Sequence, residues 1–360
     1  MWTTFKGKRV SSILGILPER VGMFDDEVAN YTFSPQQTMR LKKIMGFNTH
    51  RISKETTTVS DFAITGIKYI FEHNWITKEE IGAVIVATLC PDYFLPHISN
   101  IIQGECDLSH DVVCLDIAQG CCGYIVGLME SFMLLEHIKD KKIILVNGDV
   151  LMHRISSKDR NEYPIMGDAA AISIVENINN DVGNDREIHL GLMMDGRRRN
   201  CLKIPAGGFR TPSTPETAEM KDCGDGNIRA LDHMFMDGAE VMNFVMREIP
   251  PLVDGLYKRA GEKIEDTDYF LFHQPNRFIL EKLAQKMKVD KLKMPMDLVE
   301  KTGNPSGASI PLITALDFGE RFVKNEYRCC LSGFGSGLAF GAILMNFGKF
   351  KHCEVIETRL

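Results

Sequence analysis

A cysteine stands directly before an almost uniformly apolar helical segment. Cys121 follows a turn of small residues after a strand that is expected to end at Ile117, and the stretch from Gly123 onward is apolar around most of a helix's circumference. Such a helix is expected to be buried in the centre of the molecule. The unpaired N–H groups and positive dipole end at a helix N-terminus favour a thiolate, which is the nucleophilic form of cysteine. Cys121 is therefore a candidate nucleophile, and an inert core cysteine is the alternative.

A histidine and an asparagine stand at two later turns. His273 closes the apolar run 269–273, and the carboxyl end of a buried strand is where open α/β sheets bind ligands. Asn304 lies in the turn 303–309 before a predicted helix, where its amide N–H would donate to a developing negative oxygen. A structural histidine and a helix-capping asparagine are the alternatives.

A glycine-rich turn, Gly333-Phe334-Gly335-Ser336-Gly337, lies near the end of the chain. It lacks the G-x-G-x-x-G spacing, and a strand rather than a helix is predicted after it, so we reject a dinucleotide-binding site. Glycines here instead suit a backbone N–H that faces a reacting carbonyl oxygen.

The elements that must position these turns alternate between strand and helix, which predicts an α/β layered fold. Apolar runs that indicate strands buried on both faces lie at residues 81–88, 112–117, 142–147, 170–175, 269–273, 327–332 and 341–347. Helical patterns lie at residues 59–73, 123–139, 278–286 and 309–322. The order of features repeats, so we predict two duplicated halves, 1–182 and 183–360, with the seam in the polar stretch 177–187. The Gly/Pro/Thr-rich excursion 205–225 is expected to be an active-site or surface loop.

Composition excludes several classes of protein. The chain has 360 residues, of which 44% are hydrophobic and 25% are charged, which is typical of a globular protein and excludes intrinsic disorder. The formal net charge is 42 − 48 = −6, so we expect no nucleic-acid partner, and an acidic partner would need a local basic patch.

The apolar runs, the first twenty residues and the cysteine spacing together indicate the cellular compartment. No apolar run approaches the ~20 residues of a membrane span, and the basic residues among the first twenty argue against a secretory signal. The ten cysteines show no C-x-x-C spacing, so we expect no metal site and reduced thiols in a cytoplasmic protein.

Four motifs together resemble the thiolase superfamily, and most closely its β-ketoacyl-acyl carrier protein synthase III group. They are D-I-A-Q-G-C-C-G-Y at 116–124, F-H-Q-P-N at 272–276, G-N-P-S-G-A-S at 303–309 and G-F-G-S-G at 333–337. Each motif alone is weak, but four in the right order across two similar halves are specific, and the resemblance covers nearly the whole chain.

The resemblance implies a five-layered αβαβα thiolase fold, a homodimer and no cofactor, with substrates carried as coenzyme A or phosphopantetheine thioesters. It implies that Cys121 accepts an acyl group and that the backbone N–H groups of Cys121 and Ser336 form an oxyanion hole. It also implies that His273 and Asn304 stabilise the enolate formed when malonyl-acyl carrier protein loses carbon dioxide. The implied activity is decarboxylative Claisen condensation in fatty acid or specialised lipid biosynthesis.

The sequence departs from the family pattern at places that concern substrate delivery. Relatives that use coenzyme A primers carry tryptophan and arginine where this chain has Arg40 and Ile44, which leaves room for a protein-borne acyl donor. Leu95, in a loop resembling one that crosses the dimer interface, stands where an aromatic residue often reaches the partner's site.

Two basic clusters are candidates for docking an acidic acyl carrier protein. One consists of Arg277, Lys282 and Lys286, which are predicted to share a helix, and the other is the run Arg197-Arg198-Arg199. A solvated charged face is the alternative for both clusters.

Three other functions are compatible with the motifs. The first is an acyltransferase of the same fold that moves an acyl group from Cys121 to an alcohol or amine. The second is an enzyme similar to 3-hydroxy-3-methylglutaryl-coenzyme A synthase, for which the sequence identifies no acidic carboxyl group. The third is a catalytically silent partner subunit, although such partners commonly lose the nucleophile or its helpers.

Overall fold

Two large sheets form the framework of the protein. The computed structural model describes residues 1–138, 140–178 and 186–360. Within these residues, six strands form one sheet in the order β17 (His352–Thr358), β2 (Lys8–Pro18), β8 (Ala169–Asn177), β7 (Lys142–Asp149), β5 (Ile81–Thr88) and β6 (Val113–Ala118). Five strands form the other in the order β1 (Trp2–Phe5), β9 (Ile188–Met194), β16 (Ala339–Gly348), β15 (Glu326–Gly335) and β14 (Tyr269–Phe272).

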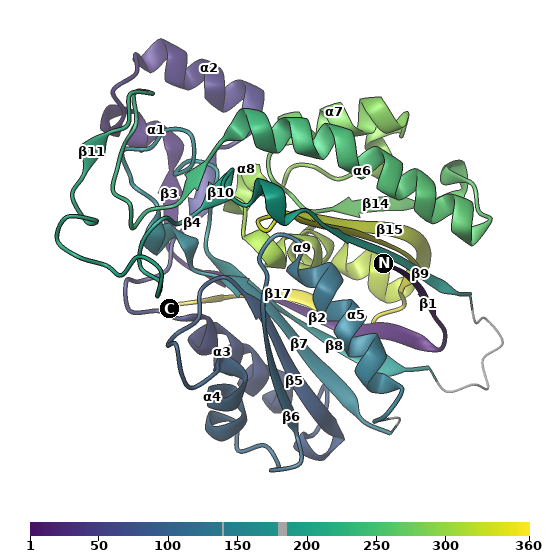
Figure 1. Cartoon of the computed structure of the whole chain (residues 1–360). Coiled ribbons are helices and arrows are strands. Elements are labelled where there is room, and N and C mark those ends of the chain that lie inside the picture. The colour runs from purple at the N-terminus through teal and green to yellow at the C-terminus, as the bar shows by residue number, and fades with distance from the viewer. Residues whose placement is uncertain (139, 179–185) are drawn as a thin grey trace.

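Helices lie between the two sheets and on both outer faces (Figure 1). The central layer holds α5 (Gly123–Leu135) and α9 (Ser309–Lys324), whose apolar side chains join one core cluster with residues of both sheets. Helices α3 (Val59–Glu72) and α4 (Ile98–Glu105) cover the six-stranded sheet, and α6 (Gly238–Ala260) and α7 (Arg277–Met287) cover the five-stranded one. The predicted five-layered αβαβα thiolase-like fold is confirmed.

The two sheets repeat one arrangement of strands. The order β2-β8-β7-β5 in the first half matches β9-β16-β15-β14 in the second. In both sets the first two neighbouring pairs are antiparallel and the last pair is parallel. The central helices also correspond, because α5 leads into β7 and α9 leads into β15.

The first and last strands of the chain each pair with a strand of the opposite half. Strand β1 pairs antiparallel with β9, whereas β17 pairs parallel with β2. Each sheet therefore takes one edge strand from the other half of the sequence. The predicted boundary between residues 182 and 183 lies outside the described residues.

The predicted elements correspond closely to the observed ones. Strand β5 has the predicted bounds, and β14 ends at Phe272, which leaves His273 just beyond the strand. The helix predicted at 123–139 ends at Leu135, and residue 139 lies outside the described part of the chain. The excursion 205–225 is largely exposed and contains one short strand, β11 (Lys221–Asp222), paired with β12 (Ile228–Arg229).

Smaller elements border these layers. They are β3 (Val21–Met23), α1 (Phe24–Glu27), α2 (Pro35–Met45), β4 (Thr49–Arg51), β10 (Leu202–Lys203), β13 (Phe235–Met236) and α8 (Leu298–Thr302). None of the helices in the described residues combines the length and apolar character needed to cross a membrane.

Candidate active site

Cys121 lies between β6 and the start of α5, against the glycine-rich turn 333–337, whose first three residues are the end of β15. Cys122 is the N-cap residue of the helix. A Cβ atom added at Gly335 would stand 2.5 Å from Cys121 Cβ and 2.8 Å from its Sγ. Because these contacts are far shorter than normal van der Waals distances, only glycine fits beside the cysteine.

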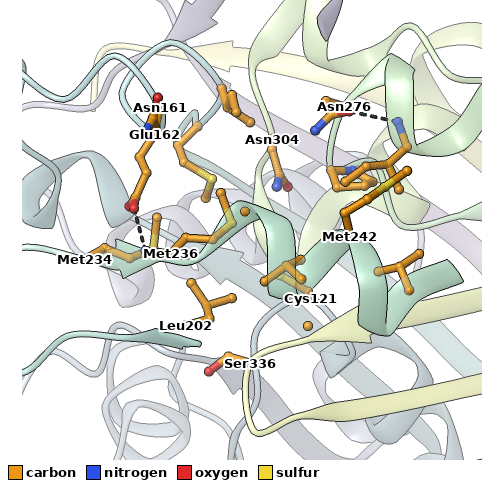
Figure 2. A pocket seen from close by; sticks show the side chains of 18 of the residues that line it. Cys121, Asn161, Glu162, Leu202, Met234, Met236, Met242, Asn276, Asn304 and Ser336 are labelled. Carbon is orange, nitrogen blue, oxygen red and sulfur yellow. Dashed lines mark hydrogen bonds between the residues drawn. The ribbon is translucent and has the colours of Figure 1, made fainter. Parts of the chain in front are cut away.

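The same turn brings a second backbone donor to the sulfur. The N–H groups of Cys121 and Ser336 both lie close enough to the Cys121 sulfur to lower its pKa. Figure 2 shows Cys121 and Ser336 in one cavity. Two backbone N–H groups beside a candidate nucleophile make this turn a candidate oxyanion hole.

Burial, rather than the helix end, dominates the protonation of Cys121. Burial raises the pKa of the Cys121 thiol to about 11, and the hydroxyl of Ser306, with its Oγ 3.7 Å from Sγ, offsets part of this rise. The backbone N–H groups at this turn stabilise the thiolate, as the sequence led us to expect, but burial outweighs them and the neutral thiol is favoured. Removing water from around a charge costs more than these N–H groups return.

His273 follows β14 and is held by a serine of the central layer. Its Nδ1 lies 2.8 Å from the hydroxyl oxygen of Ser309, which also accepts the Gln274 N–H at 3.3 Å. Ser309 can then donate its own proton to Nδ1, which leaves the ring proton on Nε2. Burial lowers the pKa of His273 to about 3, so the imidazole is neutral at physiological pH.

Asn304 is fixed through its backbone and its side-chain oxygen. Its N–H donates to the Ile165 carbonyl at 2.7 Å, and its Oδ1 accepts the Ser306 N–H at 2.9 Å. The preceding Gly303 has φ +75°, and a Cβ there would stand 2.5 Å from the Met166 oxygen. Since Oδ1 is engaged, the Nδ2 group is left to donate to a ligand.

One cavity of about 600 Å³ contains all of these groups. Cys121, His273, Asn304 and Ser336 line it, so the structure brings together the four residues that the sequence identified in separate turns. The rest of its wall is mainly apolar, with residues such as Leu151, Met166, Met234, Met242 and Phe334. Such a lining suits an acyl chain beside a few polar groups.

Sequence reasoning missed several polar residues of this cavity, among them Ser306 and Glu162. Ser306 stands inside the quoted G-N-P-S-G motif, with φ 51°, but no spacing rule connects its hydroxyl with Cys121. Glu162 lies in the segment between β7 and β8 and gave no signal, because one acidic residue in a polar segment is usually solvated.

The residues predicted to dock a carrier protein differ in their surroundings. Arg277, Lys282 and Lys286 share α7 as predicted, but Arg277 forms an ion pair with Glu300, while both lysines are exposed. In the second cluster, Arg197 and Arg198 contact Asp195 at 2.9 Å and 3.6 Å.

The three residues at which the sequence departs from the family pattern, Arg40, Ile44 and Leu95, differ in their exposure and in their contact with the cavity. Ile44, on α2, lines the cavity, whereas Arg40 on the same helix is exposed. Leu95 is 82% exposed. In the described residues no group of His, Cys, Asp and Glu side chains is placed to hold a metal ion, and all ten cysteines are free.

Comparison with known proteins agrees with this geometry. The family model described as 3-oxoacyl-[acyl-carrier-protein (ACP)] synthase III matches residues 115–196, and that for its C-terminal part matches residues 257–347. A Campylobacter jejuni protein named putative 3-oxoacyl-[acyl-carrier-protein] synthase 3 is 30% identical over 349 residues, covering 96% of each chain. A Clostridioides difficile β-ketoacyl-[acyl-carrier-protein] synthase III is 27% identical over 302 residues, covering 84% of this chain and 88% of its own.

A solved structure shows the same fold over the whole chain. The 3-oxoacyl-(acyl-carrier protein) synthase from Burkholderia xenovorans superimposes with a TM-score of 0.89 at 28% identity, covering 99% of both chains. The motifs, the layered fold and these similarities agree. The chain is an enzyme of the 3-oxoacyl-[acyl-carrier-protein] synthase III family, within the thiolase superfamily.

Proposed function

We propose that the protein condenses an acyl thioester with malonyl-acyl carrier protein, through an acyl-Cys121 intermediate, to give a 3-oxoacyl thioester. The observation that carries this proposal is the shared cavity, in which a cysteine faces two backbone N–H groups, a neutral imidazole and an oriented amide. An acidic acyl carrier protein is the proposed partner, and fatty acid or specialised lipid synthesis in the cytoplasm is the proposed setting. No cofactor takes part.

In the first half-reaction, Cys121 Sγ attacks the carbonyl carbon of the acyl thioester. The resulting oxyanion is held by the N–H groups of Cys121 and Ser336. The bond to the carrier sulfur then breaks, and the proton of the Cys121 thiol leaves with the carrier as its free thiol. Because the resting thiol is neutral, deprotonation accompanies the attack.

In the second half-reaction, the malonyl thioester loses carbon dioxide, and the electron pair of the broken bond forms an enolate. His273 Nε2–H and Asn304 Nδ2–H donate to the enolate oxygen, which neutral donors can do without a metal ion. The enolate carbon attacks the acyl-Cys121 carbonyl, a carbon–carbon bond forms, and the Cys121 sulfur leaves and regains a proton from solvent.

Release of labelled carbon dioxide tests this proposal. With malonyl-carrier protein labelled in the free carboxyl group, the acylated enzyme is expected to release the label and form a 3-oxoacyl product. An acyltransferase and a 3-hydroxy-3-methylglutaryl-coenzyme A synthase-like enzyme would release no label, and a silent subunit would not acylate Cys121. Any of these results would overturn the proposal.

Asn304→Ala separates the two half-reactions. Loss of one oxyanion donor costs about 100- to 1000-fold, so we expect that loss in condensation with little change in the acylation of Cys121. Single-turnover acylation, followed by intact-protein mass spectrometry, and steady-state condensation measure the two steps. Equal losses in both steps would contradict the role assigned to Asn304.

Exposed apolar side chains support a homodimer as the proposed assembly. Tyr93, Phe94 and Leu95 are exposed, and the ring of Phe94 lies 4.9 Å from that of the exposed Phe209. A contiguous exposed apolar patch is typical of a protein interface. We therefore propose that these residues meet a second copy of the chain.

A further inference from the structure

Glu162 is a buried acid in the wall of the catalytic cavity. Its side chain lines the cavity although the residue is only 1% exposed to solvent. One carboxyl oxygen, Oε1, accepts the Met236 N–H at 2.6 Å. The other, Oε2, is buried and has no hydrogen-bond partner in the part of the chain that the structure describes. Because a buried polar group left unpaired is costly, Oε2 is a candidate contact for a bound ligand.

Glu162 lies among buried apolar residues of the cavity wall. Its apolar neighbours in the wall, which include Leu151, Ile165, Met166 and Met234, are all buried. Figure 2 shows the Glu162 carboxyl group beside Met236, with Met242 and Asn276 on the other side of Cys121. The exposed residues of the wall are Ile44, Leu89, Asn161, Lys203, Ile204, Gly238 and Ala239. Because Cys121 and Glu162 line the same cavity, an acyl chain held on Cys121 has an apolar wall along which to reach Glu162.

The surroundings of Glu162 favour the neutral acid. Burial and the nearby Asp159 carboxylate raise the pKa of Glu162 to about 8, and Arg229 offsets only part of this rise. Arg229 is itself held by Asp159 at 2.7 Å and by Asp225 at 3.2 Å. A neutral carboxyl group both donates and accepts a hydrogen bond, and an alcohol has the same two capacities.

We propose that Glu162 is a specificity-determining residue that selects acyl chains bearing a hydroxyl group, which pairs with its free carboxyl oxygen. This inference rests on the proposed function, because it names the acyl group that Cys121 accepts. A plain hydrocarbon chain would fill the same space and leave Oε2 unpaired. Sites with buried hydrogen-bonding groups discriminate strongly against analogues that lack the matching group.

The test compares matched pairs of acyl thioesters. Pantetheine thioesters with chains of four to eight carbons are prepared without substituents, with a hydroxyl group at carbon 3, or with one at the chain end. The acylation rate of Cys121 is measured by intact-protein mass spectrometry. We expect at least one hydroxylated chain to react about 10- to 100-fold faster than its parent.

Substitutions of residues in the cavity wall test whether Glu162 causes the preference for hydroxylated chains. Glu162→Leu should abolish it, because the apolar side chain offers no hydrogen bond. Glu162→Gln keeps a donor and an acceptor and should retain most of it. The matched control, Met234→Leu, alters the wall without removing a polar group and should also retain it. Thermal denaturation shows whether each variant is folded.

The inference is overturned if no hydroxylated chain outpaces its parent in the unmodified enzyme, a result that needs no variant. It is also overturned if the preference survives in folded Glu162→Leu. The proposed function fails separately, when no thioester of the panel acylates Cys121 at all. Acylation by parent and hydroxylated chains at equal rates would remove only the role of Glu162.

Discussion

The sulfur of Cys121 is subject to two opposing effects. The N–H groups of Cys121 and Ser336 and the hydroxyl of Ser306 stabilise negative charge on it, whereas burial in an apolar cavity disfavours that charge. Burial dominates, and the resting residue is a neutral thiol. In the proposed reaction, the reactivity of this thiol comes from groups that stabilise negative charge as it develops.

The pH dependence of alkylation follows from this balance. Below a pKa of about 11 the thiolate fraction grows roughly tenfold per pH unit. The iodoacetamide reaction of Cys121 should therefore rise from pH 7 to 10 without levelling. Ser306→Ala removes a group that lowers this pKa and should slow alkylation severalfold at fixed pH. Peptide mass spectrometry reports the site of modification, and a plateau below pH 8 would show that the thiolate is already present at rest.

Gly335 allows the glycine-rich turn 333–337 to approach Cys121 closely. Gly335→Ala places a methyl group against Cys121 Cβ and Sγ, and a displacement of ~1 Å can cost about 100-fold in rate. We expect that loss in Cys121 acylation. The matched control, Gly104→Ala, changes an exposed residue of α4 with no atom within 4 Å of the added carbon, and the acylation rate of this variant should not change. A normal rate in Gly335→Ala would contradict the close packing.

At the scale of elements, α5 positions Cys121 because the helix is buried between the sheets. Phe132 on this helix is fully buried in the central core cluster, where its ring lies 5.5 Å from that of Phe5 on β1. Helix α5 therefore begins beside the active-site cysteine and packs against β1, a strand from the start of the chain.

Phe132→Ala should destabilise the protein by about 3–5 kcal/mol, because it opens a cavity that packed neighbours cannot fill. The next residue, Met133, is 45% exposed, so Met133→Ala should change the free energy of unfolding by no more than about 0.5 kcal/mol. Urea denaturation measures both variants. Similar losses would show that the two faces of α5 are not distinguished by burial.

At the scale of the whole molecule, the net charge of −6 opposes an acidic partner, so docking needs a local basic surface. On α7, Lys282 and Lys286 are exposed, although the Lys286 ammonium group donates to the Met246 carbonyl at 2.7 Å. Arg277 is engaged with Glu300. The two lysines are therefore the stronger candidates for carrier contact.

Reversing both lysines to glutamate should raise the KM for a carrier-borne substrate by about three- to tenfold, since an exposed charge pair contributes ~0.2–1 kcal/mol. The KM for a small pantetheine thioester should not change. Lys324→Glu with Arg359→Glu gives the same change in net charge at other exposed sites and serves as the control. An unchanged carrier KM in the α7 variant would remove this docking surface.

Much of the molecule could be predicted from local patterns. Strand β5 and the start of α5 follow from a continuous β-branched run and an apolar helical pattern, which depend on neighbours in sequence. The pairing of β1 and β17 with the opposite halves could not be predicted. Short edge strands carry no signal that identifies a partner far along the chain.

The sequence by itself determined the layered fold, the likeness of the two halves and the turns that hold Cys121, His273 and Asn304, because residue type and spacing are local properties. Only the tertiary structure decided that these turns share one cavity, that Cys121 is a neutral thiol at rest, and that Ser306 and Glu162 join them. The physical reason is that burial and pairing depend on atoms brought from distant segments, and these set the protonation and hydrogen-bonding state of every group in the site.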